Sequence, residues 1–205
     1  IDEYIEELAQ FTSDRISDLR ADSHSQSIAG LVVSHRIMKT RRGDDMAVIT
    51  LDDRSGRIEM TLFSEELSRF REHLKDDIVV VCDGVVTPDE REGGLKLRGN
   101  SITLLGDARR QRARAVVIRL AAADFRGDLG SRLEAALRPD TGEGCPVWVE
   151  YSGRSARGRI VLGEGWRIDP NDDCLARLKQ QFGNDRVSVR YREQRSLAPV
   201  QLATA

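Results

Sequence analysis

Five short runs of strand character lie between Ile28 and Leu105, with one helical pattern between the third and the fourth. The clearest run, residues 57–63, alternates apolar and polar side chains, which is the period of a half-buried β-strand. Ser64 and the two glutamates after it are typical of a helix start, because serine caps free backbone N–H groups and acids favour the positive end of the helix dipole. This order of elements limits the segment to a small curved sheet with one inserted helix.

That order of elements is typical of an OB-fold, a partly open five-stranded barrel whose face and connecting loops commonly bind single-stranded nucleic acid. We expect its strands at residues 28–38, 46–51, 57–63, 78–85 and 95–105, within a domain that spans residues 26–106. Gly30 lies inside the first run and indicates a bulge or a tight bend, which barrels use to curl a long strand.

The connection between the first two expected strands carries Lys39, Arg41 and Arg42 beside Gly43. Glycine permits a tight turn that lets the backbone approach a ligand closely, so these three cations are the first candidates for phosphate contacts. The alternative is a solubilising loop tip. If all three contact phosphates, binding should weaken as salt is added. The slope of the logarithm of the binding constant against the logarithm of the salt concentration should be about −2, because each contact to a single strand contributes about −0.7. Second-rank candidates, for which ordinary barrel surface is the alternative, are Arg36, Arg54, Arg57, Lys96 and Arg98.

Aromatic residues make up 5% of the chain, and only Phe63 and Phe70 occur within the expected barrel. Proteins that bind single strands tightly usually stack bases on aromatic side chains. We expect Phe70 to lie in the core beneath the helix, and Phe63, at the end of a strand, to be a core residue as well. The sequence therefore predicts weak, charge-driven binding without base specificity.

The composition restricts the partners and the compartment. The net charge is −2, so any site for nucleic acid must be a local patch. No apolar run approaches the ~20 residues that span a bilayer, and we recognise no secretory signal, so we expect a cytoplasmic protein. The first residue is Ile1, which suggests a fragment of a longer chain. Three dispersed cysteines, Cys82, Cys145 and Cys174, suit a reduced compartment and make a zinc site improbable.

Paired acids at residues 44–45, 52–53, 76–77 and 172–173 raise the question of a metal site, because carboxylates that converge in space are the usual protein ligands of magnesium. These pairs lie in expected turns and at an expected helix start, where aspartate is favoured for backbone reasons. We recognise neither a catalytic triad nor a glycine-rich phosphate loop. We therefore expect no catalysis, metal or cofactor in this chain.

A second, α+β domain is expected over residues 115–192. Its strands are predicted at residues 115–120, 146–151, 157–162 and 187–191. Apolar residues four apart from Phe125 to Leu137 predict one helix, and Asp169–Pro170 is typical of the start of another. Residues 1–25 are expected to be a helical connector, residues 107–114 a solvated basic linker with four arginines, and residues 193–205 a flexible tail.

Short motifs spread over both expected domains carry a family resemblance. They are residues 30–33, the loop 39–43, the run Leu51-Asp52-Asp53-Arg54-Ser55-Gly56-Arg57-Ile58, and residues 93–96, 146–147 and 166–170. Together they resemble the C-terminal region of the bacterial DNA polymerase III alpha subunit, over residues 1–192. The match in the second domain makes this resemblance more specific than the barrel motifs alone.

The resemblance implies a barrel near the template DNA and a last domain to which the clamp-loader subunit tau attaches. The family's carboxylates that hold two magnesium ions lie upstream and are absent here, so the fragment is not expected to polymerise by itself. Expected partners are single-stranded DNA, tau and other replisome subunits, with no membrane. Phe182 and Tyr191 are our candidates for the tau contact. Residues 186–191 lack the glutamine of a clamp-binding peptide, so no clamp binding is assigned.

Two alternatives stay open at this point. The Leu51–Ile58 run is also similar to anticodon-binding barrels of some aminoacyl-tRNA synthetases, which would prefer folded tRNA to single-stranded DNA. A pure protein-interaction scaffold would bind no DNA at all. Trp148 and Trp166 fit either a core or an interface, since tryptophan is common in both, and we expect at least one in the core.

Overall fold

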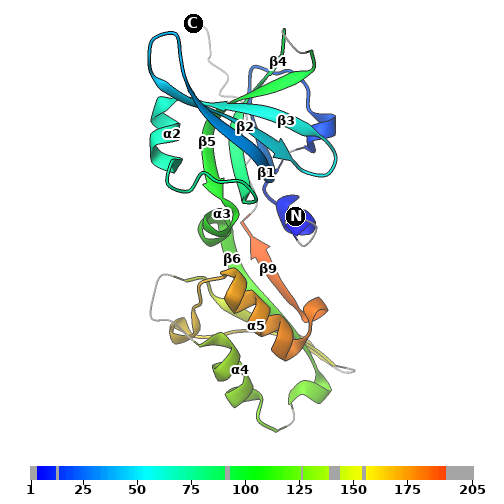
Figure 1. Ribbon diagram of the computed structural model, residues 1–205. Coiled ribbons are helices and arrows are strands. Elements are labelled where there is room, and N and C mark those ends of the chain that lie inside the picture. Colours follow the sequence, from blue (N-terminus) through cyan, green and yellow to red (C-terminus); the bar gives the residue numbers. More distant parts are fainter. Residues whose placement is uncertain are drawn as a thin grey trace, which may run out of the picture. The chain divides into compact units, whose positions relative to one another are not determined.

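The computed structural model describes residues 4–12, 14–90, 93–125, 127–138, 144–153 and 156–192 (Figure 1). The chain divides into two compact units, Ile1–Ala108 and Arg109–Ala205. Among the described residues, every helix is too short or too polar to cross a lipid bilayer. The expected flexible tail, residues 193–205, lies outside the described residues.

The first unit is built on a closed five-stranded barrel, as expected of an OB-fold. The strand order is β1-β2-β3-β5-β4, and the only parallel pair among these neighbours is β3–β5. Helix α2 (Ser64–Phe70) follows β3 and lies beside the barrel (Figure 1). The strands are β1 (Ser25–Lys39), β2 (Asp45–Asp52), β3 (Arg57–Leu62), β4 (Val79–Pro88) and β5 (Leu95–Leu104).

Strand β1 is long enough to pair with both β2 and β4, which closes the barrel. The register shifts between Val32 and Ser34, so the bulge that we expected at Gly30 lies beyond it. Gly30 has a different reason to be glycine: a Cβ there would lie 3.0 Å from the backbone oxygen of Asp52 on the neighbouring strand. A side chain at this position would require the neighbouring strand to shift by a few tenths of an ångström.

The segment before the barrel contributes to the barrel core. It contains α1 (Ile5–Leu8) and the 3-10 helix η2 (Ile16–Asp18), and both Ile16 and Leu19 are buried in the same cluster as the strand residues. The backbone N–H of Ile16 donates a 2.8 Å hydrogen bond to the Asp53 carboxylate in the β2–β3 turn. The segment 1–25, expected to be a helical connector, therefore contributes part of the hydrophobic core.

The second unit is a four-stranded mixed sheet in the order β8-β7-β6-β9, with helices α4 and α5 packed on one face, which confirms the α+β expectation. Figure 1 shows both helices on the same side of β6 and β9. The elements are β6 (Ala113–Ala121), η3 (Ala122–Phe125), α4 (Leu129–Leu137), β7 (Val147–Ser152), β8 (Arg157–Val161), η4 (Glu164–Trp166), α5 (Asp172–Phe182), η5 (Asn184–Arg186) and β9 (Val187–Tyr191).

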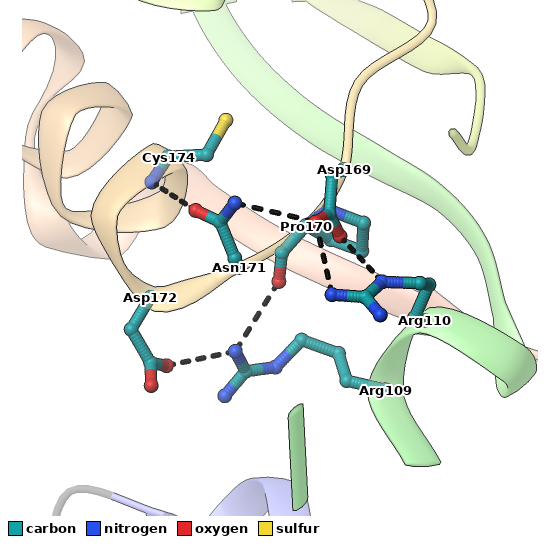
Figure 2. Close-up of polar contacts among 7 residues, drawn as sticks. All are labelled: Arg109, Arg110, Asp169, Pro170, Asn171, Asp172 and Cys174. Atoms are coloured by element: carbon teal, nitrogen blue, oxygen red, sulfur yellow. Dashed lines mark hydrogen bonds and ion pairs between the residues drawn. The ribbon is translucent and has the colours of Figure 1, made fainter. Parts of the chain in front are cut away.

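The two helices of the second unit begin later than the sequence pattern predicts. Phe125 lies in η3 rather than in α4, and its side chain is 41% exposed. Helix α5 is capped by Asn171, whose side-chain oxygen accepts a 2.8 Å hydrogen bond from the N–H of Cys174 (Figure 2). Asp169, the expected cap, instead binds Arg110 through two 3.1 Å contacts.

The expected basic linker over residues 107–114 is instead helix α3 (Leu105–Arg112) followed by the start of β6. Arg109 is only 1% exposed, and its guanidinium donates to the Pro170 carbonyl at 3.2 Å and to the Asp172 carboxylate at 2.7 Å (Figure 2). The arginine run by itself does not predict this burial, because its partners lie about sixty residues later in the sequence. Arg109 and Arg110 hold the start of α5 in place, so their charges serve the fold of the second unit.

Candidate nucleic-acid interface

The loop between β1 and β2 is a tight hairpin with two arginines at its tip. Gly43 has φ of 91° and donates to the Thr40 carbonyl at 2.9 Å, while the N–H of Thr40 donates to the Asp44 carbonyl at 2.8 Å. Only glycine adopts such a φ without strain, so Gly43 permits the turn. Arg41 and Arg42 are exposed, and their guanidinium groups have no ion pair within the described part of the chain.

Lys39, the third expected phosphate contact, is already held by the protein's own acid. Its Nζ lies 2.9 Å from the Asp45 carboxylate, and Arg71 at the end of α2 reaches the other oxygen of the same carboxylate at 2.9 Å. The hydrogen bond from Lys39 and then that from Arg71 lower the pKa of Asp45. Asp45 is therefore ionised at neutral pH, and two cations that flank the loop are engaged by it.

The strand register gathers most second-rank candidates on one outward face of the barrel. The row His35–Ile49–Met60–Leu97 crosses β1, β2, β3 and β5, and its last three members are completely buried. Because side chains alternate along a strand, the two rows on either side of it point outward. These rows are Arg36–Val48–Thr61–Arg98 and Ser34–Thr50–Glu59–Lys96.

Acids of the barrel already neutralise several of these outward cations. Arg36 lies 3.2 Å from Glu59, and Lys96 lies 3.8 Å from Asp89. Arg57 donates to Asp52 at 2.8 Å, and this hydrogen bond is the largest cause of the lowered pKa of the Asp52 carboxyl. Arg98, on one of the outward rows, and the two arginines at the loop tip have no ion pair within the described part of the chain.

Arg54 lies in the β2–β3 turn rather than on the outward rows of the barrel. It has φ of 75°, a left-handed conformation that is uncommon for a residue with a side chain. Its backbone N–H donates to the Asp52 carboxylate at 2.8 Å, which helps to hold the turn. Arg54 stays a second-rank prediction.

Phe63 is partly exposed rather than a core residue. It is 37% exposed, and the Arg98 guanidinium carbon lies 5.4 Å from the centre of its ring. The alternation of residues 57–63 contained the signal, because Ile58 and Leu62 point inward and the next position must then point outward. Phe70, by contrast, is buried in the barrel core as expected. Phe63 and Arg98 together offer one position where a base could stack.

The two candidates for a partner contact in the second unit have different surroundings. Phe182 is 6% exposed within the hydrophobic core, with Arg132 above its ring, so it cannot serve as a docking residue. The helical spacing of Leu175, Leu178 and Phe182 is that of a core face, which is what the structure shows. Tyr191, in β9, is half-buried and stays a prediction.

The two tryptophans of the second unit are both partly buried. Trp166 packs against the core of the unit. Trp148 lies between two arginines, with the guanidinium carbons of Arg114 and Arg159 at 5.4 and 4.3 Å from the centre of its ring. One tryptophan therefore supports the core, whereas the other lies on the sheet face opposite the helices.

The described residues contain no cluster of three or more histidine, cysteine, aspartate or glutamate side chains that could hold a metal ion. Burial raises the pKa of all three cysteine thiols, that of Cys145 to about 11. A raised pKa suppresses the thiolate that would act as a nucleophile or metal ligand.

Two family models match the chain, one in each unit. Residues 26–105 match an OB-fold nucleic acid binding domain. Residues 132–183 match the C-terminal domain of DNA polymerase III subunit alpha. The first match covers the barrel, and the second covers α4 through α5.

Curated relatives extend the similarity to nearly the whole chain. DNA polymerase III subunit alpha of Pseudomonas aeruginosa is 40% identical over 192 residues, which is 94% of this chain and 16% of that protein. The subunits of Vibrio cholerae and Escherichia coli K12 are 38% and 32% identical over 93% of this chain, and 17% of each protein is covered. A solved domain of replication protein A from Methanococcus maripaludis is 25% identical over 45% of this chain and 93% of that domain, with a TM-score of 0.38.

The chain spans about one sixth of the length of the curated relatives it matches. The similarity runs through both units, and the family model of the second unit is specific to DNA polymerase III subunit alpha. The chain, which combines an OB-fold with a match to the C-terminal domain of the family, is therefore homologous to the C-terminal region of DNA polymerase III subunit alpha.

Proposed function

We propose that the barrel binds single-stranded DNA without base specificity, through the sugar-phosphate backbone. The observation that carries this proposal is the exposed loop tip, where Arg41 and Arg42 lack an acidic partner within the described residues. Formal charges over residues 39–45 sum to +1, although the whole chain is acidic. A local cationic tip next to an outward sheet face is suited to bind a DNA single strand that lies along the protein surface.

The structure lowers the salt dependence that we expect of this binding. With Lys39 engaged by Asp45, two phosphate contacts remain at the tip, which corresponds to a log–log slope of about −1.4 rather than about −2. Phe63 adds a stacking position beside Arg98, but one aromatic that is only partly exposed gives little affinity and no base readout.

The whole protein, as its homology implies, is a DNA-directed DNA polymerase, and this chain would be its C-terminal part. We propose that nucleotide transfer and magnesium binding belong to residues outside this chain. We also propose that the second unit docks the clamp-loader tau subunit. The support is the resemblance to the alpha subunit and the match of residues 132–183 to its C-terminal domain.

The loop tip is tested by titrating fluorescein-labelled oligothymidine with the chain at several salt concentrations, followed by fluorescence anisotropy. The double variant Arg41→Ala/Arg42→Ala should bind weakly, with a slope near zero. Arg190→Ala/Arg192→Ala removes the same charge from exposed positions of the second unit and is the matched control. Equal losses in both double variants would show that only net charge matters and would reject the loop as the site.

The stacking position is tested with Phe63→Ala in the same titration. We expect about fivefold weaker binding, which corresponds to about 1 kcal/mol, the low end of a base–aromatic stack. Phe125→Ala, at a phenylalanine of similar exposure in the second unit, is the control and should leave the affinity unchanged. Unchanged affinity in Phe63→Ala would remove this residue from the interface.

The alternatives are separated by competitor and by partner. A folded tRNA that displaces oligothymidine at lower concentration than unlabelled DNA would favour the anticodon-binding reading. Absence of any DNA binding at low salt would favour a protein scaffold. Retention of the chain on immobilised tau, with loss when residues 109–205 are blocked by an antibody against that unit, tests the docking role.

A further inference from the structure

The sheet of the second unit has an exposed edge strand with apolar side chains. Strand β8 lies at the end of the order β8-β7-β6-β9, and all five of its residues are exposed. Ile160 and Val161 are 50% and 59% exposed, which makes them the most exposed large apolar side chains among the described residues. Proteins usually protect such an edge, because its free backbone groups can pair with another chain.

The hydrogen-bond pattern shows which backbone groups of β8 are free to pair. Leu162 donates to the Val147 carbonyl at 3.0 Å, so positions 147 and 162 form a bonded pair of the antiparallel ladder. Bonded and non-bonded pairs alternate along such a ladder, so Val149–Ile160 is the next bonded pair. The residues whose N–H and carbonyl groups point away from β7 are therefore Arg157, Arg159 and Val161.

The two faces of this edge differ in chemistry. Ile160 pairs with buried Val149 and lies on the same face as the helices. On the opposite, open face, Arg159 lies above Trp148 and 2.7 Å from Glu150. A groove of about 680 Å³ lies over this open face beside β8, and its charged lining residues are four arginines and two acids: Arg119, Arg157, Arg159, Arg186, Glu150 and Asp185. Arg119 and Arg159 share Glu150, and Arg186 pairs with Asp124 at 2.7 Å. Among the described residues, Arg157 is therefore the lining arginine without an ion pair.

We propose that β8 binds an extended peptide segment of a partner protein as an additional strand, with acidic and apolar residues alternating along the peptide. Backbone hydrogen bonds to β8 would supply general affinity, as in other cases of β-strand addition. An acidic side chain would enter the groove and pair with Arg157, and the apolar ones would cover Ile160 on the other face. This proposal rests on the docking role proposed for the second unit and names the surface that performs it.

The features of this edge favour a peptide over a second copy of the chain and over single-stranded DNA. A second copy paired antiparallel through β8, with the two Gly158 residues opposed, would place Arg157 and Arg159 opposite one another across the new ladder, and like charges in directly opposed positions are destabilising. Single-stranded DNA could meet the arginines but would leave the free backbone groups and Ile160 unused. A peptide with acidic and apolar positions satisfies all three features of the edge.

The probe is a fluorescein-labelled peptide of alternating glutamate and valine, titrated with the whole chain and followed by fluorescence anisotropy. Val161→Pro removes one outward N–H without removing a bond to β7, and proline is tolerated at an edge where its nitrogen faces solvent. Loss of one backbone hydrogen bond predicts about fivefold weaker binding, whereas Val161→Thr keeps the N–H and should bind like the wild type.

The arginine groove is tested by Arg157→Glu, with Arg190→Glu on the opposite edge strand as the control of equal charge. We expect Arg157→Glu to weaken peptide binding and Arg190→Glu to leave it unchanged. Arg157→Glu also decides the proposal if Val161→Pro fails to fold in a thermal unfolding scan. Three outcomes would each overturn the proposal. A lysine–valine peptide could bind as tightly as the glutamate–valine peptide, Arg157→Glu and Arg190→Glu could weaken binding equally, or oligothymidine could displace the peptide.

The docking role is judged separately by capture of the chain on immobilised tau. Capture with no peptide binding would reject the β8 surface and leave the docking role intact. Peptide binding sensitive to Arg157→Glu, without capture by tau, would support the surface and reject tau as its partner.

Discussion

Asp45 sets how many cations the barrel can offer to DNA, and Asp45→Asn tests this directly. The wild-type carboxylate binds Lys39 and Arg71, each at 2.9 Å. Because the pKa of Asp45 is lowered by these two partners, the group is charged at neutral pH, and asparagine removes a full negative charge. The formal charge of residues 39–45 then rises by one, and both cations are released at the base of the loop.

The expected gain follows from counterion release. Each phosphate contact to a single strand contributes about −0.7 to the log–log slope, so the slope should steepen from about −1.4 to about −2.1 if only Lys39 joins, and to about −2.8 if Arg71 joins as well. One additional contact corresponds to about eightfold tighter binding at about 50 mM salt and about threefold at about 200 mM.

The assay is the oligothymidine titration at four or more salt concentrations, with Glu164→Gln as the control. Glu164 is 89% exposed and pairs with Arg167 at 3.2 Å in the second unit, so its change alters net charge equally without releasing a cation near the loop. A parallel shift in both variants, or an unchanged slope in Asp45→Asn, would refute the assignment of the β1–β2 loop as the phosphate-binding site.

Four further predictions concern stability and reactivity. Gly84→Ala should destabilise the barrel by about 1–3 kcal/mol in chemical denaturation, because its Cβ would collide with a backbone carbonyl of β5. Gly130→Ala should stabilise the second unit by up to about 1 kcal/mol, because a Cβ at this position on α4 meets no other atom and alanine favours the helix. A lower free energy of unfolding in this variant would contradict the prediction. Cys145, with its pKa raised to about 11, should react with iodoacetamide near about pH 8 far more slowly in the native chain than in urea, and equal rates would show that the thiol is accessible. The pKa of Asp52 is lowered by Arg57, so its stabilising contribution is present above the unfolded pKa and is lost as pH falls; unfolding scans below about pH 4 should show a shallower loss in Asp52→Asn than in the wild type.

Local patterns in the sequence predicted the barrel well because its strands are defined by alternation. The run Arg57–Leu62 shows this directly, since its inward residues are completely or almost completely buried. Continuing the same alternation by one residue would also have placed Phe63 outside. Its apolar character alone predicts a core position, whereas its place after inward-pointing Leu62 predicts the exposure that the structure shows.

Contacts between distant residues could not be predicted from local patterns. Arg71 pairs with Asp45 across 26 positions, so the sequence gives no local sign that the loop acid recruits it. Arg109 is buried by partners more than sixty positions away, and a run of arginines without those partners is indistinguishable from a solvated linker. Composition predicted the charge of these residues, whereas only the tertiary fold determines whether that charge is available to a ligand.

The position of Ile16 and Leu19 has a practical consequence for anyone who wishes to isolate the barrel. A fragment cut at residue 26, where both the expected domain and the domain match begin, would lack two side chains that are buried in the hydrophobic core of the barrel. Full burial of such residues is worth roughly 1.5–3 kcal/mol each, a large share of the stability of a small domain. A truncation that retains these upstream residues should give a well-folded product, whereas the shorter one should expose apolar core surface and aggregate.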